Sequence, residues 1–230
     1  SVKRQGSPVT LSVEPERNEE GVCCIGAWVR DSMAGIGTVT YYDPDTNTFG
    51  ALGHGITDGD TAALMPFGNG SILPSTVKAV KKGTCGSAGE LRGNFDLTEE
   101  LGQLYANTSC GIFGTVTDGC ALTDGEALPV EQPEEGPAVI RSNVSGDAVK
   151  EYTVEILKKI PDVSDGRELV LSVTDPELIA ATGGIVQGMS GSPIIQNGKL
   201  VGAVTHVLLS DPTKGYGISV ETMLNTGEPA

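Results

Sequence analysis

The sequence predicts an all-β fold, because short apolar runs alternate with turn residues along most of its length. The 32 glycines and 13 prolines fall between these runs, and only 4% of the 230 residues are aromatic. Such spacing is typical of short strands joined by tight turns, with few long helices. A chain of this length can bury the core of one large β architecture or of two packed barrels.

The first half of the chain is predicted to form the first of two β-barrels, over residues 21–122. Residues 1–20 combine a short alternating strand with a charged run typical of a linker. Glycines 35 and 37 and the run Asp43-Pro44-Asp45 mark the turns of two successive hairpins. Further strands are expected in SILPSTVKAVKKG, GELRGNFDL and CGIFGTV.

The second half is predicted to form a second barrel, over residues 138–230. Residues 123–137, which are rich in proline and acidic side chains, are the best candidate for the connection between the halves. Asn197-Gly198 marks a hairpin turn. Strands are expected in EYTVEILKKI and ELVLSVTD, and a short helix or a loop in PELIAATGG.

Charge excludes some classes of partner. Thirty acidic residues against fifteen basic ones give a formal net charge of −15, which disfavours binding to nucleic acid or anionic lipid. No stretch approaches the ~18 apolar residues of a membrane span. The first residues lack the apolar core of a signal peptide, so we expect any targeting or anchoring segment to have been removed or never present.

The five cysteines predict neither a metal centre nor a complete set of disulfides. Their number is odd and no C-x-x-C pair occurs, so a zinc site is not expected and no cofactor is required. A disulfide between Cys110 and Cys120 stays open, because geometry rather than sequence decides pairing. The other cysteines are expected to be structural: Cys23, Cys24 and Cys85.

The turn Gly188-Met189-Ser190-Gly191-Ser192-Pro193 carries the clearest chemical signal. A serine becomes a nucleophile only when a base takes its proton and donors receive the oxyanion, and a glycine-rich turn suits both needs. The run follows the Gly-x-Ser-Gly-x-Pro pattern of chymotrypsin-like serine peptidases. It makes Ser190 the candidate nucleophile and the N–H groups of Gly188 and Ser190 the oxyanion hole, with Ser192 supporting the turn. Taken alone, the run is equally compatible with a plain glycine turn.

The position of His54 decides between these interpretations. His54 follows the apolar pair Ala51-Leu52 and precedes Ser190 by 136 residues, which is the order and scale of a two-barrel serine peptidase. We therefore predict the chymotrypsin-like double β-barrel fold, with His54 as the general base. The only other histidine, His206, is a less favoured candidate base. With Thr205 and Val207 it is expected to line an extended substrate at a strand edge.

Two aspartates compete for the role of the triad acid. Spacing favours Asp96, which lies between His54 and Ser190 as in the chymotrypsin order. Asp175 lies only 15 residues before Ser190 and belongs to the second predicted barrel. Asp58 and Asp60 lie too close to His54 in an open loop to be preferred.

Two long segments carry a resemblance to a known family. They begin with WVRDSMAGIGTVTYYDPDTNTFGALGHGITD and with TDPELIAATGGIVQGMSGSPIIQNGKLVGAVTHVLL. Both closely resemble the peptidase domain of the stage IV sporulation protein B family, from about Ile25 to Leu224. The resemblance implies a serine endopeptidase whose catalytic histidine and serine fall on His54 and Ser190. It places the acid on Asp175, against the spacing argument.

The same resemblance implies partners and a location. Members of the family cleave themselves and then a membrane-bound regulator of an intramembrane protease, which allows a sporulation sigma factor to be processed. They act in the space between the membranes of mother cell and forespore. They also carry a PDZ domain ahead of the peptidase, and residues 1–20 resemble the end of such a domain followed by a linker. The alternative function is a catalytically silent pseudoprotease or binding module of the spore envelope.

Overall fold

The computed structural model describes residues 1–230 except 5, 28–32, 120–121, 123–126, 162–164 and 228–230. It divides into two compact units, residues 1–35 and residues 36–230. The smaller unit contains two short hairpins, and none of its described residues is buried. These hairpins are formed by β1 (Val2–Arg4) with β2 (Ser7–Val9) and by β3 (Glu16–Arg17) with β4 (Cys23–Cys24). That residues 1–20 are the end of a PDZ domain followed by a linker stays a prediction.

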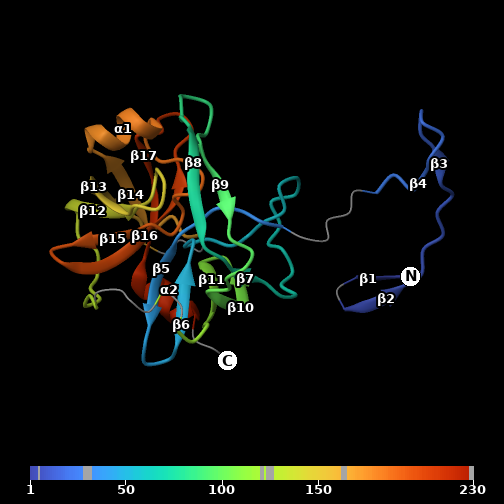
Figure 1. Ribbon diagram of the computed structural model, residues 1–230, viewed down its shortest axis with the longest axis horizontal. Coiled ribbons are helices and arrows are strands. Elements are labelled where there is room, and N and C mark those ends of the chain that lie inside the picture. Colours follow the sequence, from blue (N-terminus) through green and yellow to red (C-terminus); the bar gives the residue numbers. More distant parts are fainter. Residues whose placement is uncertain (5, 28–32, 120–121, 123–126, 162–164, 228–230) are drawn as a thin grey trace. The chain divides into compact units, whose positions relative to one another are not determined.

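The larger unit begins with a five-stranded antiparallel sheet (Figure 1). Its strand order is β5 (Val39–Asp43), β6 (Thr48–Ala51), β11 (Gly111–Val116), β10 (Gly102–Thr108) and β7 (Ser71–Ile72). Phe49, Ala51, Ile112 and Val116 form its buried face. The predicted turn after β5 is confirmed, since Asp43 Oδ1 accepts a 2.9 Å hydrogen bond from the Asp45 N–H. Strand β10 was not predicted from the sequence.

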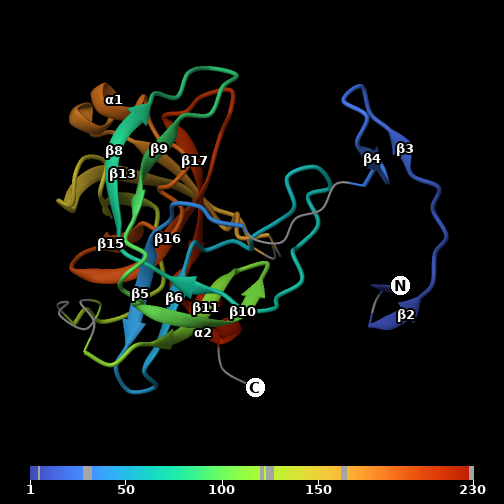
Figure 2. The same ribbon diagram turned by 45° about the vertical axis from the view of Figure 1, so that its right-hand side comes forward.

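The expected first barrel does not close. Strands β8 (Ser75–Lys81) and β9 (Glu90–Phe95) form a separate hairpin, which leaves the five-stranded sheet as a half-barrel. The hairpin lies beside the second half of the chain in both views (Figure 1 and Figure 2). Val77 exchanges both backbone hydrogen bonds with Gly146, and the Leu91 N–H donates to the Gln187 C=O. The outer edges of the hairpin are thus occupied by the second half instead of closing the first.

The second half closes into a six-stranded barrel, as the sequence predicts. Alternate side chains are buried along β13 and β14, which matches the period-two pattern of the sequence. The hairpin turn at Asn197-Gly198 is confirmed, with φ values of 52° and 75° that suit a type I′ turn. Around the barrel the order is β12 (Gly136–Ser142), β13 (Lys150–Lys159), β14 (Leu169–Val173), β17 (Lys214–Ser219), β16 (Lys199–Val207) and β15 (Pro193–Gln196).

Two short helices complete the fold. Helix α1 (Pro176–Thr182) resolves the choice left open for PELIAATGG in favour of a helix, which ends at Gly183 in the left-handed conformation. Helix α2 (Val220–Gly227) was not predicted, and it packs Met223 into a cluster with Phe113 and Ile218. Among the described residues, no helix is long and apolar enough to span a membrane.

Candidate active site

The loop that carries Ser190 is attached to the first half of the chain by main-chain hydrogen bonds. The Thr38 N–H donates to the Ser190 C=O at 2.8 Å, and the Thr40 hydroxyl donates to the Gly191 C=O at 2.8 Å. Gly191 has φ +88°, and a Cβ there would lie 2.0 Å from the Thr38 carbonyl oxygen. Glycine at 191 is therefore required for the two halves to meet at the candidate nucleophile.

His54 is brought to the same junction by the residue before it. Gly53 has φ +69°, and a Cβ there would lie 2.8 Å from side-chain carbons of both Thr205 and Ile218. The loop that follows β6 therefore packs directly on β16 and β17 of the barrel. As a result, the ring centroids of His54 and His206 are 4.9 Å apart, with 39° between the ring planes.

The turn around Ser190 leaves two backbone donors free. The Met189 N–H donates to the Val186 C=O, and the Gly191 N–H donates to the Val204 C=O. Over the described part of the chain, the N–H groups of Gly188 and Ser190 have no acceptor. Both residues are half-buried, and two neighbouring donors that are not used inside the protein are the groups that an oxyanion hole requires.

In this structure the Ser190 hydroxyl and His54 make separate hydrogen bonds. Ser190 Oγ donates to the Thr205 C=O at 3.0 Å, and His54 Nδ1 lies 2.9 Å from the Gly55 carbonyl oxygen. No hydrogen bond joins Ser190 to His54 among the described residues. Burial lowers the pKa of His54 below its ordinary value of 6.5, and the bond to Gly55 opposes this shift. The imidazole is therefore a neutral potential base at neutral pH.

Strand β16, which follows the turn of Ser190, has beyond Ala203 an edge with no pairing strand among the residues that the structure describes. Leu208 donates to the Lys214 C=O, and His206 lies opposite Tyr216 in the same ladder. Because backbone groups alternate in direction along an antiparallel strand, the N–H and C=O of Val207 point away from β17. On that side β15 pairs with β16 only as far as Ala203. The predicted substrate-lining residues Thr205, His206 and Val207 thus lie at one strand edge beside Ser190.

The structure gives Asp175 a place at the start of α1. It is the N-cap residue, and its carboxylate accepts hydrogen bonds from the N–H groups of Leu178 at 3.0 Å and Thr153 at 3.2 Å. Burial raises the pKa of Asp175, but these donors outweigh it and hold the pKa below its usual value. Asp175 makes no hydrogen bond with His54 in this structure, so its role as triad acid stays a prediction.

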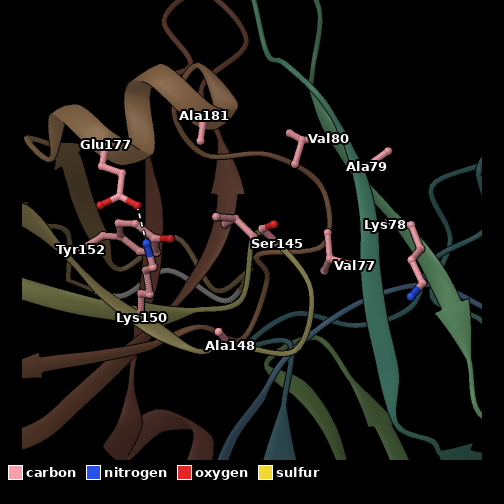
Figure 3. A pocket seen from close by; sticks show the side chains of 11 residues that line it. Val77, Lys78, Ala79, Val80, Ser145, Ala148, Lys150, Tyr152, Glu177 and Ala181 are labelled. Atoms are coloured by element: carbon pink, nitrogen blue, oxygen red, sulfur yellow. Dashed lines mark hydrogen bonds and ion pairs between the residues drawn. The ribbon is translucent and has the colours of Figure 1, made fainter.

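A groove lies between α1, which contributes Glu177 and Ala181, and β8, which contributes Val77 and Val80 (Figure 3). It has a volume of about 360 Å³. Lys150 and Glu177 form an ion pair of 2.5 Å along one side, with Tyr152 next to them. Lys150 also favours the ionised form of Asp175, which lowers its pKa. Asp175 therefore begins the helix as an ionised carboxylate that Lys150 stabilises.

The other candidate acids are engaged in local turns. Asp96 is exposed, and it accepts hydrogen bonds from the hydroxyl of Thr98 at 2.6 Å and its N–H at 2.9 Å. Asp58 accepts from the N–H and hydroxyl of Thr61. In the described part of the chain, neither Asp96 nor Asp58 is hydrogen-bonded to His54.

Ser192 does not support its turn through its hydroxyl. The side chain is fully buried, and Oγ has no hydrogen-bond partner in the described part of the chain. Its backbone holds the turn instead, because the N–H donates to the Met189 C=O and the C=O accepts from Val204.

This position allows a first prediction. Removal of an unsatisfied buried hydroxyl should stabilise the fold, so we expect Ser192→Ala to raise the free energy of unfolding by about 1 kcal/mol. Peptidase activity should stay unchanged, because Ser192 Oγ contacts no reacting group. Urea unfolding together with a peptide-hydrolysis assay measures both effects. A large loss of activity with an intact fold would contradict the assignment of Ser190 alone as nucleophile.

Four of the five cysteines lie in the described part of the chain. Cys23, Cys24, Cys85 and Cys110 are free thiols. Cys120 lies outside the described residues, so a disulfide between Cys110 and Cys120 stays an open question. No cluster of three or more metal-ligating side chains occurs among the residues that the structure describes.

Comparison with known proteins assigns the chain to a family. The model of the SpoIVB peptidase S55 family matches residues 21–224, which is nearly the whole chain. The chain belongs to the SpoIVB peptidase S55 family. It is therefore a serine peptidase, which makes the junction of His54 and Ser190 the candidate active site. The family expectation drawn from the sequence is thereby confirmed.

The chain has only distant similarity to solved structures. The inactive form of the Rv3671c protease of Mycobacterium tuberculosis is 16% identical, with a TM-score of 0.41 over 70% of this chain and 87% of that one. Its active form is 14% identical, with a TM-score of 0.39 over 89% of this chain and 96% of that one. No curated protein sequence matches the chain.

Proposed function

We propose that this serine peptidase is an endopeptidase that cleaves extended polypeptide segments, with Ser190 as nucleophile and His54 as general base. One observation carries the assignment of the nucleophile: Ser190 lies in a turn whose own N–H and that of Gly188 have no internal acceptor. A carbonyl oxygen held by these two donors would lie next to Ser190 Oγ. This is the arrangement that stabilises the oxyanion of a tetrahedral intermediate.

The reaction follows from the roles of these groups. His54 takes the proton from the Ser190 hydroxyl as Oγ forms a bond to the substrate carbonyl carbon, and the carbonyl π electrons move onto the oxygen. The N–H groups of Gly188 and Ser190 receive that oxyanion. His54 then returns the proton to the leaving amine as the peptide bond breaks, and a water molecule hydrolyses the acyl-enzyme by the same steps.

The Thr205 carbonyl links substrate binding to this chemistry. In the present structure it accepts the Ser190 hydroxyl at 3.0 Å. An extended substrate that pairs with the edge of β16 would bring its own N–H to the same carbonyl. The Ser190 hydroxyl would then lose its acceptor and be free to donate to His54. Catalytic hydrogen bonds that tighten only in the substrate complex are common in such enzymes.

We further propose that the chain acts in sporulation signalling. Its substrates would be a second copy of itself and a membrane-bound regulator of an intramembrane protease, in the space between the mother-cell and forespore membranes. Membership of the SpoIVB peptidase family over residues 21–224 supports this proposal. None of the described residues among 1–35 is buried, so they offer an accessible segment for self-cleavage.

Self-cleavage can be tested with the inactive variant as substrate. We expect wild-type protein to cut Ser190→Ala protein in trans, because extended exposed segments are the substrates that an edge strand can bind. Mass spectrometry of the products locates the cut sites. Cleavage of casein without any cleavage of the Ser190→Ala chain would refute self-processing but not peptidase activity. Cleavage of neither would favour the alternative of a silent pseudoprotease or binding module.

The lowered pKa of His54 predicts the pH dependence of the reaction. The base must be neutral, so kcat/KM falls as the pH drops through the pKa of His54. Since burial places this pKa below 6.5, we expect the acid limb of kcat/KM to have its midpoint below pH 6.5. A pH series with a fluorogenic peptide measures this limb. A decline that is centred above pH 6.5 would contradict the buried environment of His54.

Two substitutions at Asp175 distinguish its role as the N-cap of α1 from a role in catalysis. Asparagine caps helices as well as aspartate does, so Asp175→Asn should unfold at nearly the wild-type temperature, whereas Asp175→Ala should lose about 1 kcal/mol. The cap would be refuted if both variants were equally stable. With the fold preserved, a loss of activity in Asp175→Asn then reports on the carboxylate itself, as the family prediction of a triad acid requires.

A further inference from the structure

The contact between the two histidines joins parts of the chain that are far apart in sequence. His54 follows β6 in the first half, and His206 lies on β16 of the barrel. Their ring centroids are 4.9 Å apart and the ring planes are inclined by 39°. Both histidines are half-buried, and Nδ1 of His206 is buried with no hydrogen-bond partner among the residues that the structure describes. A buried ring nitrogen without a partner disfavours the fold, so packing alone does not explain a histidine here.

The two histidines differ in how firmly they are held. The backbone of His206 pairs with Tyr216 of β17, and the neighbouring Thr205 side chain is buried and donates to the Gly166 C=O at 2.8 Å. His54 lies in a loop, and the hydrogen bond of its ring is to the carbonyl of the adjacent residue Gly55. The backbone of His206 is therefore fixed in the barrel, and the ring that it carries lies against the ring of His54, whose backbone is in a loop.

The charges around His206 keep its ring neutral. His54 faces it from the loop after β6, Arg167 and Asp165 from the loop between β13 and β14, and Tyr216 from β17. Arg167 also lies 5.5 Å from the centre of the Tyr216 ring. Burial first, then His54 and Arg167, lower the pKa of His206 to about 4, against the opposing effect of Asp165. At neutral pH, His206 therefore adds no positive charge that would oppose protonation of His54.

We propose that His206 is a positioning residue for the candidate base, whose ring orients the His54 imidazole and shields it from water. This inference rests on the proposed function in that it takes His54 as the general base. Loss of the ring at position 206 should then have two effects. The His54 imidazole should lose its fixed orientation, and water should reach it and raise its pKa toward the ordinary value.

Proton NMR provides a direct test, because the chain contains only two histidines. In any His206 variant that is purified without a histidine tag, the one remaining imidazole signal reports the pKa of His54. We expect this pKa to rise in His206→Ala and His206→Asn, which remove the ring. It should stay at the wild-type value in His206→Phe, which keeps a ring but loses the nitrogens. Equal His54 pKa values in all four proteins would overturn the proposal.

Kinetics with the same variants provide the second readout. In His206→Ala and His206→Asn, kcat should fall by up to ~10²-fold, the cost of a misplaced catalytic group, and the acid limb of kcat/KM should move to higher pH. His206→Phe should restore both. A rise of KM alone, with kcat and the acid limb unchanged, would mean that His206 only contacts substrate and would overturn the positioning role. If no variant or wild-type protein cleaves peptides, the proposed function fails while the NMR titration still decides whether His206 shields His54.

Discussion

Replacement of Ser190 by alanine is expected to lower kcat by a factor of about 10⁶, because the nucleophile and its base act as one unit. His54→Ala should cause a loss of similar size for the same reason. Neither change should weaken the fold strongly, since the Ser190 hydroxyl makes one hydrogen bond to Thr205 and His54 makes one to Gly55. Initial rates with a fluorogenic peptide or with casein measure the effect, and circular dichroism checks the fold.

The chain offers a matched control for the serine substitution. Ser192 lies two residues from Ser190 in the same turn, and its hydroxyl has no partner. Ser192→Ala should therefore leave the rate unchanged while Ser190→Ala abolishes turnover. Equal rates in wild-type and Ser190→Ala proteins would refute Ser190 as nucleophile, whatever the cause of the residual activity.

Gly188→Ala is expected to have the second largest effect, a loss of about 10²–10³-fold in kcat. Gly188 has φ +100°, a conformation that alanine rarely adopts, and a Cβ there would lie 2.9 Å from the Cβ of Leu91. Leu91 is held in place, because its N–H donates to the Gln187 C=O and its side chain is buried. The turn must therefore rotate, which moves the N–H groups away from the oxyanion. KM should change far less than kcat, since the oxyanion forms only in the transition state.

Gly198→Ala is the control for backbone strain. Gly198 also has a positive φ of 75°, but a Cβ there has no neighbour within 4 Å, and the residue lies at the tip of the β15–β16 hairpin. It should cost some stability and leave kcat unchanged. If both glycine variants lost stability equally and neither lost kcat, Gly188 would not contribute to an oxyanion hole.

Local patterns in the sequence predicted much of the second barrel. The alternation in EYTVEILKKI and the Asn197-Gly198 turn each depend on a few neighbouring residues, and both were confirmed. The run TDPELI also contains a helix-start signal, since aspartate before proline is a favoured N-cap. That signal could have identified Asp175 as a cap from the sequence alone. The predicted position of the triad acid and a capping motif coincide at this residue, and the sequence alone does not separate the two roles.

Features that depend on contacts between distant segments were not predictable. The hairpin β8–β9 looked like part of the first barrel, but its edges pair with Gly146 and Gln187 of the second half. His206 was expected at the substrate edge, and its contact with His54 follows only from the packing of Gly53 on β16 and β17. Such contacts depend on tertiary packing, which periodicity and turn signals do not encode.

The central claim is that Ser190 is a nucleophile activated by His54. The most direct test is labelling with a serine-directed fluorophosphonate, followed by mass spectrometry of the modified peptide, on wild-type, Ser192→Ala, His54→Ala and Ser190→Ala proteins. The account predicts one adduct on Ser190 in the wild-type and Ser192→Ala proteins, a much slower reaction in His54→Ala, and none in Ser190→Ala. An unlabelled wild-type protein, or an adduct that forms on Ser190 at the same rate without His54, would contradict it.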